Sequence, residues 1–151
     1  MHKKIICQNR KASHDYFLDE FFEAGIVLYG PEAKSLRDGR ANLVDGYAGV
    51  KDGEVFLYNM HISPYPYAHH LDLDPKRTRK LLLNRREIKK LHTKTKSKGY
   101  SLIPTKIYFS GSWVKVVIAL AKGKKKVDKR HALRDKEMKR EMDQARKKRD
   151  Y

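Results

Sequence analysis

The chain has 151 residues and a formal net charge of +17, from 35 Lys and Arg against 18 Asp and Glu, a size typical of one domain with an appendage. Its single cysteine, Cys7, excludes an intramolecular disulfide and a cysteine-based zinc site. With no apolar run long enough to span a membrane and no signal-peptide pattern after Met1, we expect a soluble, cytoplasmic protein without a membrane partner.

The first quarter of the chain is predicted to contain an arm and a short helix. Residues 1–11 have the composition of a basic, poorly structured N-terminal arm. The helix is predicted to begin at Ser13 or Asp15, either of which can cap it, and to end at Gly25. Its apolar side would consist of Phe17, Leu18, Phe21 and Phe22.

The rest of the folded region, residues 12–122, is predicted to be mainly β. Strands are predicted over residues 26–29, 43–50, 54–62, 102–109 and 113–121, with one further short helix over 31–39. Asp52-Gly53 and Ser110-Gly111-Ser112 are hairpin turn signals between neighbouring strands. Several short strands and one longer helix favour an α+β chain whose strands close into a small barrel rather than a sandwich.

A longer helix is predicted over residues 76–92, where Asp74 can cap it and Pro75 can occupy its first turn. On a helical wheel, its narrow packing stripe would contain Leu81, Asn84, Ile88 and Leu91. Leu82 would point about 140° away from that stripe, among basic side chains. It is then either a stray surface leucine or an apolar contact to a ribose or base.

The net positive charge is confined to two segments. Residues 76–98 hold eleven Lys and Arg against one acid, residues 123–151 hold thirteen against six, and the remainder holds eleven of each. An electroneutral body with a basic block and a basic tail is the expected footprint of a nucleic-acid binder. The tail, residues 123–151, has high helix propensity but little apolar surface, so we expect it to be disordered when free and helical on a partner.

Catalysis has little support in the sequence. The residues that could resemble the metal-binding cluster of a hydrolase are His61, His69, His70, Asp72 and Asp74. The H-H-x-D-x-D run of residues 69–74 lies in a predicted loop without the helical spacing of a HExxH-type site, so no metal and no other cofactor is expected. A metal-dependent nuclease and a general structured-RNA or ribosome-associated module remain as alternatives.

Two further residues could contact RNA. Glu23 lies opposite the apolar side of the first predicted helix, where it is either an ordinary solvated acid or an acceptor for base amino groups or a 2′-hydroxyl. Lys115 lies on the outward side of the last predicted strand, and it is a candidate RNA contact only if the basic side of the longer helix lies beside it.

Several stretches resemble one bacterial family, the SsrA-binding proteins (small protein B). They are Asn9-Arg-Lys-Ala-Ser-His-Asp-Tyr-Phe17, Glu23-Ala-Gly-Ile26, Lys34-Ser-Leu-Arg37, Ala41-Asn-Leu43, His61-Ile-Ser-Pro-Tyr65, Asp74-Pro-Lys-Arg-Thr-Arg-Lys-Leu-Leu-Leu83, Gly123-Lys-Lys and Asp128-Lys-Arg130. The resemblance implies a barrel related to the oligonucleotide-binding (OB) fold with helices around it, and no enzymatic activity. It also implies binding to the tRNA-like domain of tmRNA and delivery of tmRNA to stalled ribosomes in trans-translation.

The resemblance also implies partners and site residues. The partners are tmRNA, the stalled 70S ribosome with its 16S rRNA and, indirectly through tmRNA, elongation factor Tu and alanyl-tRNA synthetase. The implied RNA contacts are Glu23, Leu82, Asn84 and Lys115, with Arg37, Arg77 and Arg79 as phosphate contacts. The tail residues Asp128, Lys129 and Arg130 match the motif that acts in the decoding centre, whereas Val127 replaces the more usual His or aromatic residue and cannot stack in the same way.

Overall fold

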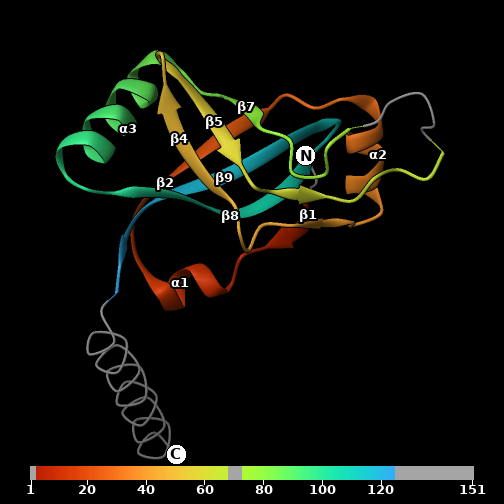
Figure 1. Cartoon of the computed structure of the whole chain (residues 1–151), viewed down its shortest axis with the longest axis horizontal. Helices are drawn as coiled ribbons and strands as arrows, with labels where there is room; N and C mark the ends of the chain where they lie inside the picture. The colour runs from red at the N-terminus through yellow and green to blue at the C-terminus, as the bar shows by residue number, and fades with distance from the viewer. Residues whose placement is uncertain (1–2, 68–72, 125–151) are drawn as a thin grey trace, which may run out of the picture.

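The computed structural model describes residues 3–67 and 73–124. In chain order its elements are β1 (Lys3–Gln8), α1 (Lys11–Asp15), β2 (Tyr16–Ile26), α2 (Gly30–Arg37), β3 (Ala41–Asn42), β4 (Tyr47–Lys51), β5 (Glu54–Tyr58), β6 (His61–Ile62), β7 (Arg79–Leu82), α3 (Arg85–Ser97), β8 (Ser101–Ser110) and β9 (Trp113–Gly123). In Figure 1, α2 and α3 lie at opposite ends of the strands, and α1 lies along one side. None of the described helices is long and apolar enough to cross a membrane.

Six strands close into a ring within one antiparallel sheet. The pairings run β8-β4-β5-β7-β2-β9 and return from β9 to β8. The β4–β8 closure is a single residue pair, Ala48 with Leu102, whereas β8 and β9 pair along almost their whole length. Strand β1 adds to β8 beyond this closure, and β3 and β6 form a separate pair. The chain is mainly β as predicted, and the strands that were expected to close into a small barrel form this ring.

The core lies inside this ring. In β9, Val116, Ile118 and Leu120 are fully buried, and their alternation fixes which side of the strand faces inward. The predicted strands over residues 102–109 and 113–121 are therefore confirmed, together with this apolar face. A smaller cluster of Ala12, Ile103 and Ala121 lies where α1 covers part of the outer side of the sheet.

The predictions for the N-terminal region were wrong in two respects. Residues 3–8 are not a poorly structured arm, because β1 pairs with β8. The predicted helix that ends at Gly25 is instead the five-residue α1 followed by the eleven-residue strand β2. The register of β2 shifts between Leu18 and Glu20. Such a bulge interrupts the period of two, so apolar residues at 17, 18, 21 and 22 imitate the spacing of a helix.

The predicted helix over residues 76–92 was also wrong in its first half. Residues 79–82 form β7, and α3 begins only at Arg85. Burial alternates along β7, because Arg79 and Leu81 are buried and Leu82 is exposed. A buried arginine disguised this alternation in the sequence. Asp74 caps a turn through the Lys76 amide, at 2.9 Å, rather than a helix.

Three other predicted strands have different bounds. The 26–29 strand is absent, because β2 ends at Ile26 and residues 27–29 lead into α2. The 43–50 strand begins only at Tyr47, after a turn in which the Gly46 amide donates to the Leu43 carbonyl. The 54–62 strand is divided into β5 and β6 near Asn59, which has a φ of 59°. The predicted 31–39 helix is confirmed as α2.

Candidate nucleic-acid interface

Three strands bring together Glu23, Leu82 and Lys115 on the outer side of the ring. Gly25 of β2 pairs with Leu82 of β7 on one side and with Lys115 of β9 on the other. Glu23 lies two residues before Gly25, on the same side of β2. The intervening Ala24 is buried in the core, so Glu23 points outward. Residues separated by up to 92 positions in the sequence thus form one surface, which we call the β2–β7–β9 face.

Gly25 allows Leu82 to lie close against β2. A Cβ atom at position 25 would lie 3.3 Å from the Leu82 Cβ, which is tighter than ordinary contact. Leu82 is 53% exposed, and it lines a groove of about 440 Å³ with Trp113, Lys115 and Gly25. Trp113, which the sequence did not mark as a site residue, is 71% exposed. Exposed apolar and aromatic side chains beside a lysine suit an unstacked base or a ribose.

Glu23 lies beside Tyr108, a buried residue of β8. Burial raises the pKa of Tyr108 to about 12, and the neighbouring Glu23 carboxylate adds to the rise. The Lys3 and Lys106 ammonium groups lie 5.3 and 5.7 Å from the centre of the Tyr108 ring. Glu23 is therefore an exposed carboxylate beside Tyr108, and it can accept hydrogen bonds from base amino or 2′-hydroxyl groups.

Asn84 caps α3, and it is not part of a packing stripe as the helical wheel predicted. Its side-chain Oδ1 accepts a hydrogen bond from the backbone amide of Glu87 at 2.9 Å, and the Glu87 carboxylate accepts one from the backbone amide of Asn84 at 3.3 Å. This reciprocal arrangement is a capping box, which holds the side chain at the exposed start of the helix. Its Nδ2 group has no hydrogen-bond partner among the described residues, so it can donate to a ligand two residues after Leu82.

Arg79, expected as a phosphate contact, is fully buried, so that prediction was wrong. Its Nε donates to Glu32 Oε2 at 2.7 Å, and its other nitrogens donate to the carbonyls of Met60 and Pro75. Arg77 is partly buried, and it donates to Glu32 Oε1 at 2.7 Å. The Arg77 guanidinium also lies 4.6 Å from the centre of the Tyr29 ring.

Arg37 is not among the residues that line the groove with Leu82, although Ser112 lines both that groove and the hollow beside Arg37. It is exposed near the end of α2, where it lines a separate hollow with Lys4 and Phe109. A phosphate contact by Arg37 or Arg77 stays a prediction.

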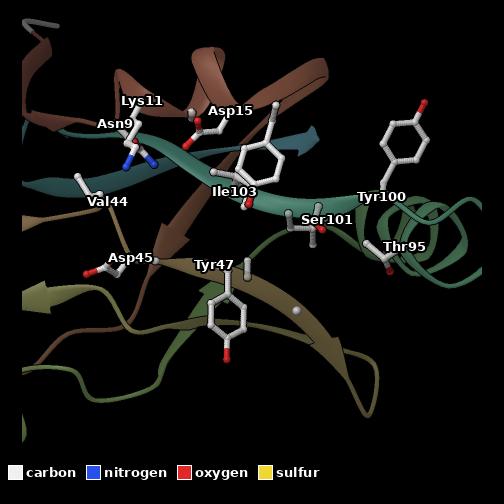
Figure 2. Close-up of a pocket in the computed structure, with 16 residues that line it drawn as sticks. Asn9, Lys11, Asp15, Val44, Asp45, Tyr47, Thr95, Tyr100, Ser101 and Ile103 are labelled. Atoms are coloured by element: carbon white, nitrogen blue, oxygen red, sulfur yellow. The ribbon is translucent and has the colours of Figure 1, made fainter. Parts of the chain in front are cut away.

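Another hollow, of about 630 Å³, lies between α1, β4 and β8. Figure 2 shows Asn9, Lys11 and Asp15 on one side of it and Val44, Asp45 and Tyr47 on the other. Among the described residues there is no group of three His, Cys, Asp or Glu side chains placed to hold a metal ion. His69, His70 and Asp72 lie outside the described residues, as do Asp128, Lys129 and Arg130.

Comparisons with known proteins all lead to the same family. The family model described as SmpB protein matches residues 6–148. The SsrA-binding protein of Macrococcus caseolyticus is 57% identical over 146 residues, which cover 97% of this chain and 95% of that protein. The SsrA-binding protein of Geobacillus thermodenitrificans is 56% identical over 142 residues, which cover 94% of this chain and 92% of that protein.

A solved structure shows the same fold. It comes from work described as "tmRNA-SmpB: a journey to the center of the bacterial ribosome" and is 42% identical, with a TM-score of 0.68 over 87% of this chain and 95% of that one. The predicted OB-like fold with flanking helices is thereby confirmed.

Proposed function

Because the chain belongs to the SsrA-binding protein (SmpB) family, we propose that it binds the tRNA-like domain of tmRNA and delivers it to stalled ribosomes for trans-translation. One observation carries the RNA-binding part of this proposal. The register of three strands places Glu23, Leu82 and Lys115 on one outer face, which offers an acceptor, an apolar contact and a cation to folded RNA.

The basic tail has a separate task in this proposal. Residues 123–151 carry a net charge of +7, which suits the rRNA-lined mRNA channel that a stalled ribosome leaves empty. Asp128, Lys129 and Arg130 would act there in the decoding centre, against 16S rRNA. Elongation factor Tu and alanyl-tRNA synthetase would meet the protein through tmRNA. The protein would work without enzymatic activity, in the cytoplasm with the ribosomes.

A competition assay tests the RNA-binding part. The tRNA-like domain of tmRNA and a bulk elongator tRNA compete for the purified protein at about 150 mM salt, each with and without magnesium. Strong preference for the tRNA-like domain, with both RNAs intact, is the expected result. Equal binding would demote the chain to a general structured-RNA module. Cleavage on addition of magnesium would support the nuclease alternative and direct attention to His69 and His70.

The general structured-RNA module remains the second candidate because of the charge pattern. Residues 76–98 hold eleven Lys and Arg, and all of them except the buried Arg79 could attract any structured RNA through its phosphates. Such binding weakens steeply with salt for every RNA alike, whereas contacts by Glu23 and Leu82 would retain a preference at high salt. The ratio of the two affinities, measured as the salt concentration rises, therefore distinguishes the two functions.

A further inference from the structure

A groove with an exposed phenylalanine adjoins the β2–β7–β9 face. Its volume is about 420 Å³, and its lining includes Arg10, Phe21, Thr105, Lys106 and Val117. We call it the Phe21 groove. We propose that it binds one unstacked nucleotide of the RNA that Glu23 contacts, with the base on the Phe21 ring and the phosphate between Arg10 and Lys106. This inference rests on the proposed function, because it extends the same RNA-binding surface.

The strand register places this groove next to Glu23. Phe21 and Glu23 are two residues apart on the same side of β2, so about 6.8 Å separates their positions along the strand. This is about twice the 3.4 Å rise between stacked nucleotides of one strand. Val117 of β9 pairs with both Glu23 and Lys106, so the anion and the cation flank one shared apolar residue. RNA that reaches Glu23 therefore has room for one more nucleotide over Phe21.

The residues that line the groove suit a base rather than a second polar group. The Thr105 hydroxyl donates its hydrogen bond to the Val117 carbonyl at 3.1 Å, so its proton is not available to a ligand in the groove. Phe21 is 55% exposed, whereas the adjacent Phe22 is only 7% exposed in the core. Arg10, at the start of α1, lines the groove with Phe21, and an aromatic ring such as that of Phe21 can stack on an unpaired base.

The charges at the groove favour an anionic occupant. Among the described residues, neither Arg10 nor Lys106 has an ion-pair partner, and Lys106 instead lies 5.7 Å from the centre of the Tyr108 ring. A second copy of this chain would bring the same two cations against themselves, which disfavours self-association there. A nucleotide supplies a flat base that can stack on the Phe21 ring and a negative charge for the two cations.

Substitutions at Phe21 test the proposal through the affinity for the tRNA-like domain of tmRNA. Phe21→Ala should weaken binding by roughly 5- to 150-fold, the range for loss of one base–aromatic stack. Phe21→Tyr and Phe21→Trp should bind within about threefold of the unchanged protein, while Phe21→Leu should bind as weakly as Phe21→Ala. Wild-type affinity in Phe21→Leu would show that only apolar bulk matters and would overturn the stacking proposal.

The matched control is Phe17→Ala. Phe17 is 49% exposed on the same strand, but it pairs with Lys122, on the side of β9 opposite to the residue that pairs with Phe21. The Phe17→Ala variant should bind the tRNA-like domain with the affinity of the unchanged protein. A benzophenone amino acid at position 21 should likewise cross-link to the RNA, and one at position 17 should not. Cross-links from position 21 to protein instead of RNA would overturn the proposal.

Two further variants separate this inference from the proposed function. If Glu23→Ala and Leu82→Ala weaken binding but Phe21→Ala does not, only the groove is wrong. If all three variants bind like the unchanged protein, the β2–β7–β9 face is wrong as well, and the groove falls with it. Sedimentation without RNA completes the test, because a dimer that Phe21→Ala dissociates would identify a second copy as the occupant and overturn the proposal.

Discussion

Arg79 and Glu32 form a buried ion pair that joins β7 to α2. The distance from Arg79 Nε to Glu32 Oε2 is 2.7 Å, and the two side chains are 0% and 4% exposed. Arg77 binds the other carboxylate oxygen, so one acid serves two arginines. Because β7 also carries Leu82, this pair fixes the strand that supplies the central apolar contact of the β2–β7–β9 face.

Removal of the Glu32 carboxylate should destabilise the fold strongly. Glu32→Ala leaves a buried guanidinium without its counter-ion, which costs about 3–5 kcal/mol of unfolding free energy. Urea denaturation measures this loss. The control is Glu54→Ala, which breaks the exposed pair with Lys80 and should cost at most about 1 kcal/mol. Equal losses in the two variants would show that the buried pair has no special weight.

The same carboxylate should make stability depend on acid pH. Burial alone would raise the pKa of Glu32, but the hydrogen bonds from Arg77, the Tyr29 backbone amide and Arg79, with the charge of Arg79, outweigh it and lower the pKa below its ordinary value. A lowered pKa in the folded state means that the contribution is fully present above the unfolded value, about 4.3, and is lost as the pH falls through the folded value.

Unfolding free energies between about pH 7 and pH 3 check this sign. The unchanged protein should lose stability over the acidic part of this range. Glu32→Gln, which has no ionisable group at this position, should give a flatter curve. Parallel curves for the two proteins would contradict the assignment.

The reactivity of Cys7 tests whether residues 3–8 form β1, where the sequence predicted a poorly structured arm. Burial raises the pKa of its thiol from 9.0 to about 11, so at pH 8 the reactive thiolate should be about a hundredfold scarcer than for an unperturbed cysteine. Alkylation by iodoacetamide at pH 8 should therefore be about a hundredfold slower in the folded protein than in urea. Equal rates would mean that residues 3–8 are not held on β8 in solution.

The sequence predicted well those elements whose local pattern agrees with their packing. The alternation from Val114 to Leu120 identified β9, and Pro31 with Gly39 bracketed α2. It predicted poorly those elements in which a distant partner changes the meaning of a residue. Arg79 resembles a surface cation until Glu32, 47 residues earlier, is placed beside it.

The site followed the same division. The outward direction of Leu82 was predicted for the wrong reason, from a helical wheel applied to residues that form β7. That Glu23 and Lys115 lie on one face with Leu82 depends on strand pairings, which no local pattern specifies. The engagement of Asn84 as a helix cap was likewise hidden, because the true start of α3 was not recognised.

The β2–β7–β9 face should provide discrimination between RNAs. Glu23→Ala or Leu82→Ala should weaken the complex with the tRNA-like domain of tmRNA by about 1–3 kcal/mol, the usual scale for a lost specific contact. Neither residue contacts phosphates in this interpretation, so affinity for an unrelated tRNA should change little. Binding titrations of both RNAs measure the difference. Equal losses for the two RNAs would show that these residues give no specificity.

The basic tail should be separable from RNA binding by the folded region. A protein truncated before Val127 keeps every described residue of the β2–β7–β9 face and the whole basic block of residues 76–98. It loses Asp128, Lys129 and Arg130, which are proposed to act in the decoding centre. We therefore expect its affinity for the tRNA-like domain to remain within about threefold of the full chain, while peptide tagging on stalled ribosomes is abolished.

Two measurements on the same truncated protein decide this division. The first is an RNA titration at about 150 mM salt, and the second is a reconstituted tagging reaction on ribosomes stalled without a stop codon. A large loss of RNA affinity would show that the tail contributes to holding tmRNA, because its charge would then be part of the same binding surface. Normal tagging would show that the tail is dispensable. Only intact affinity with lost tagging fits a folded region that holds the RNA and a tail that senses the empty channel.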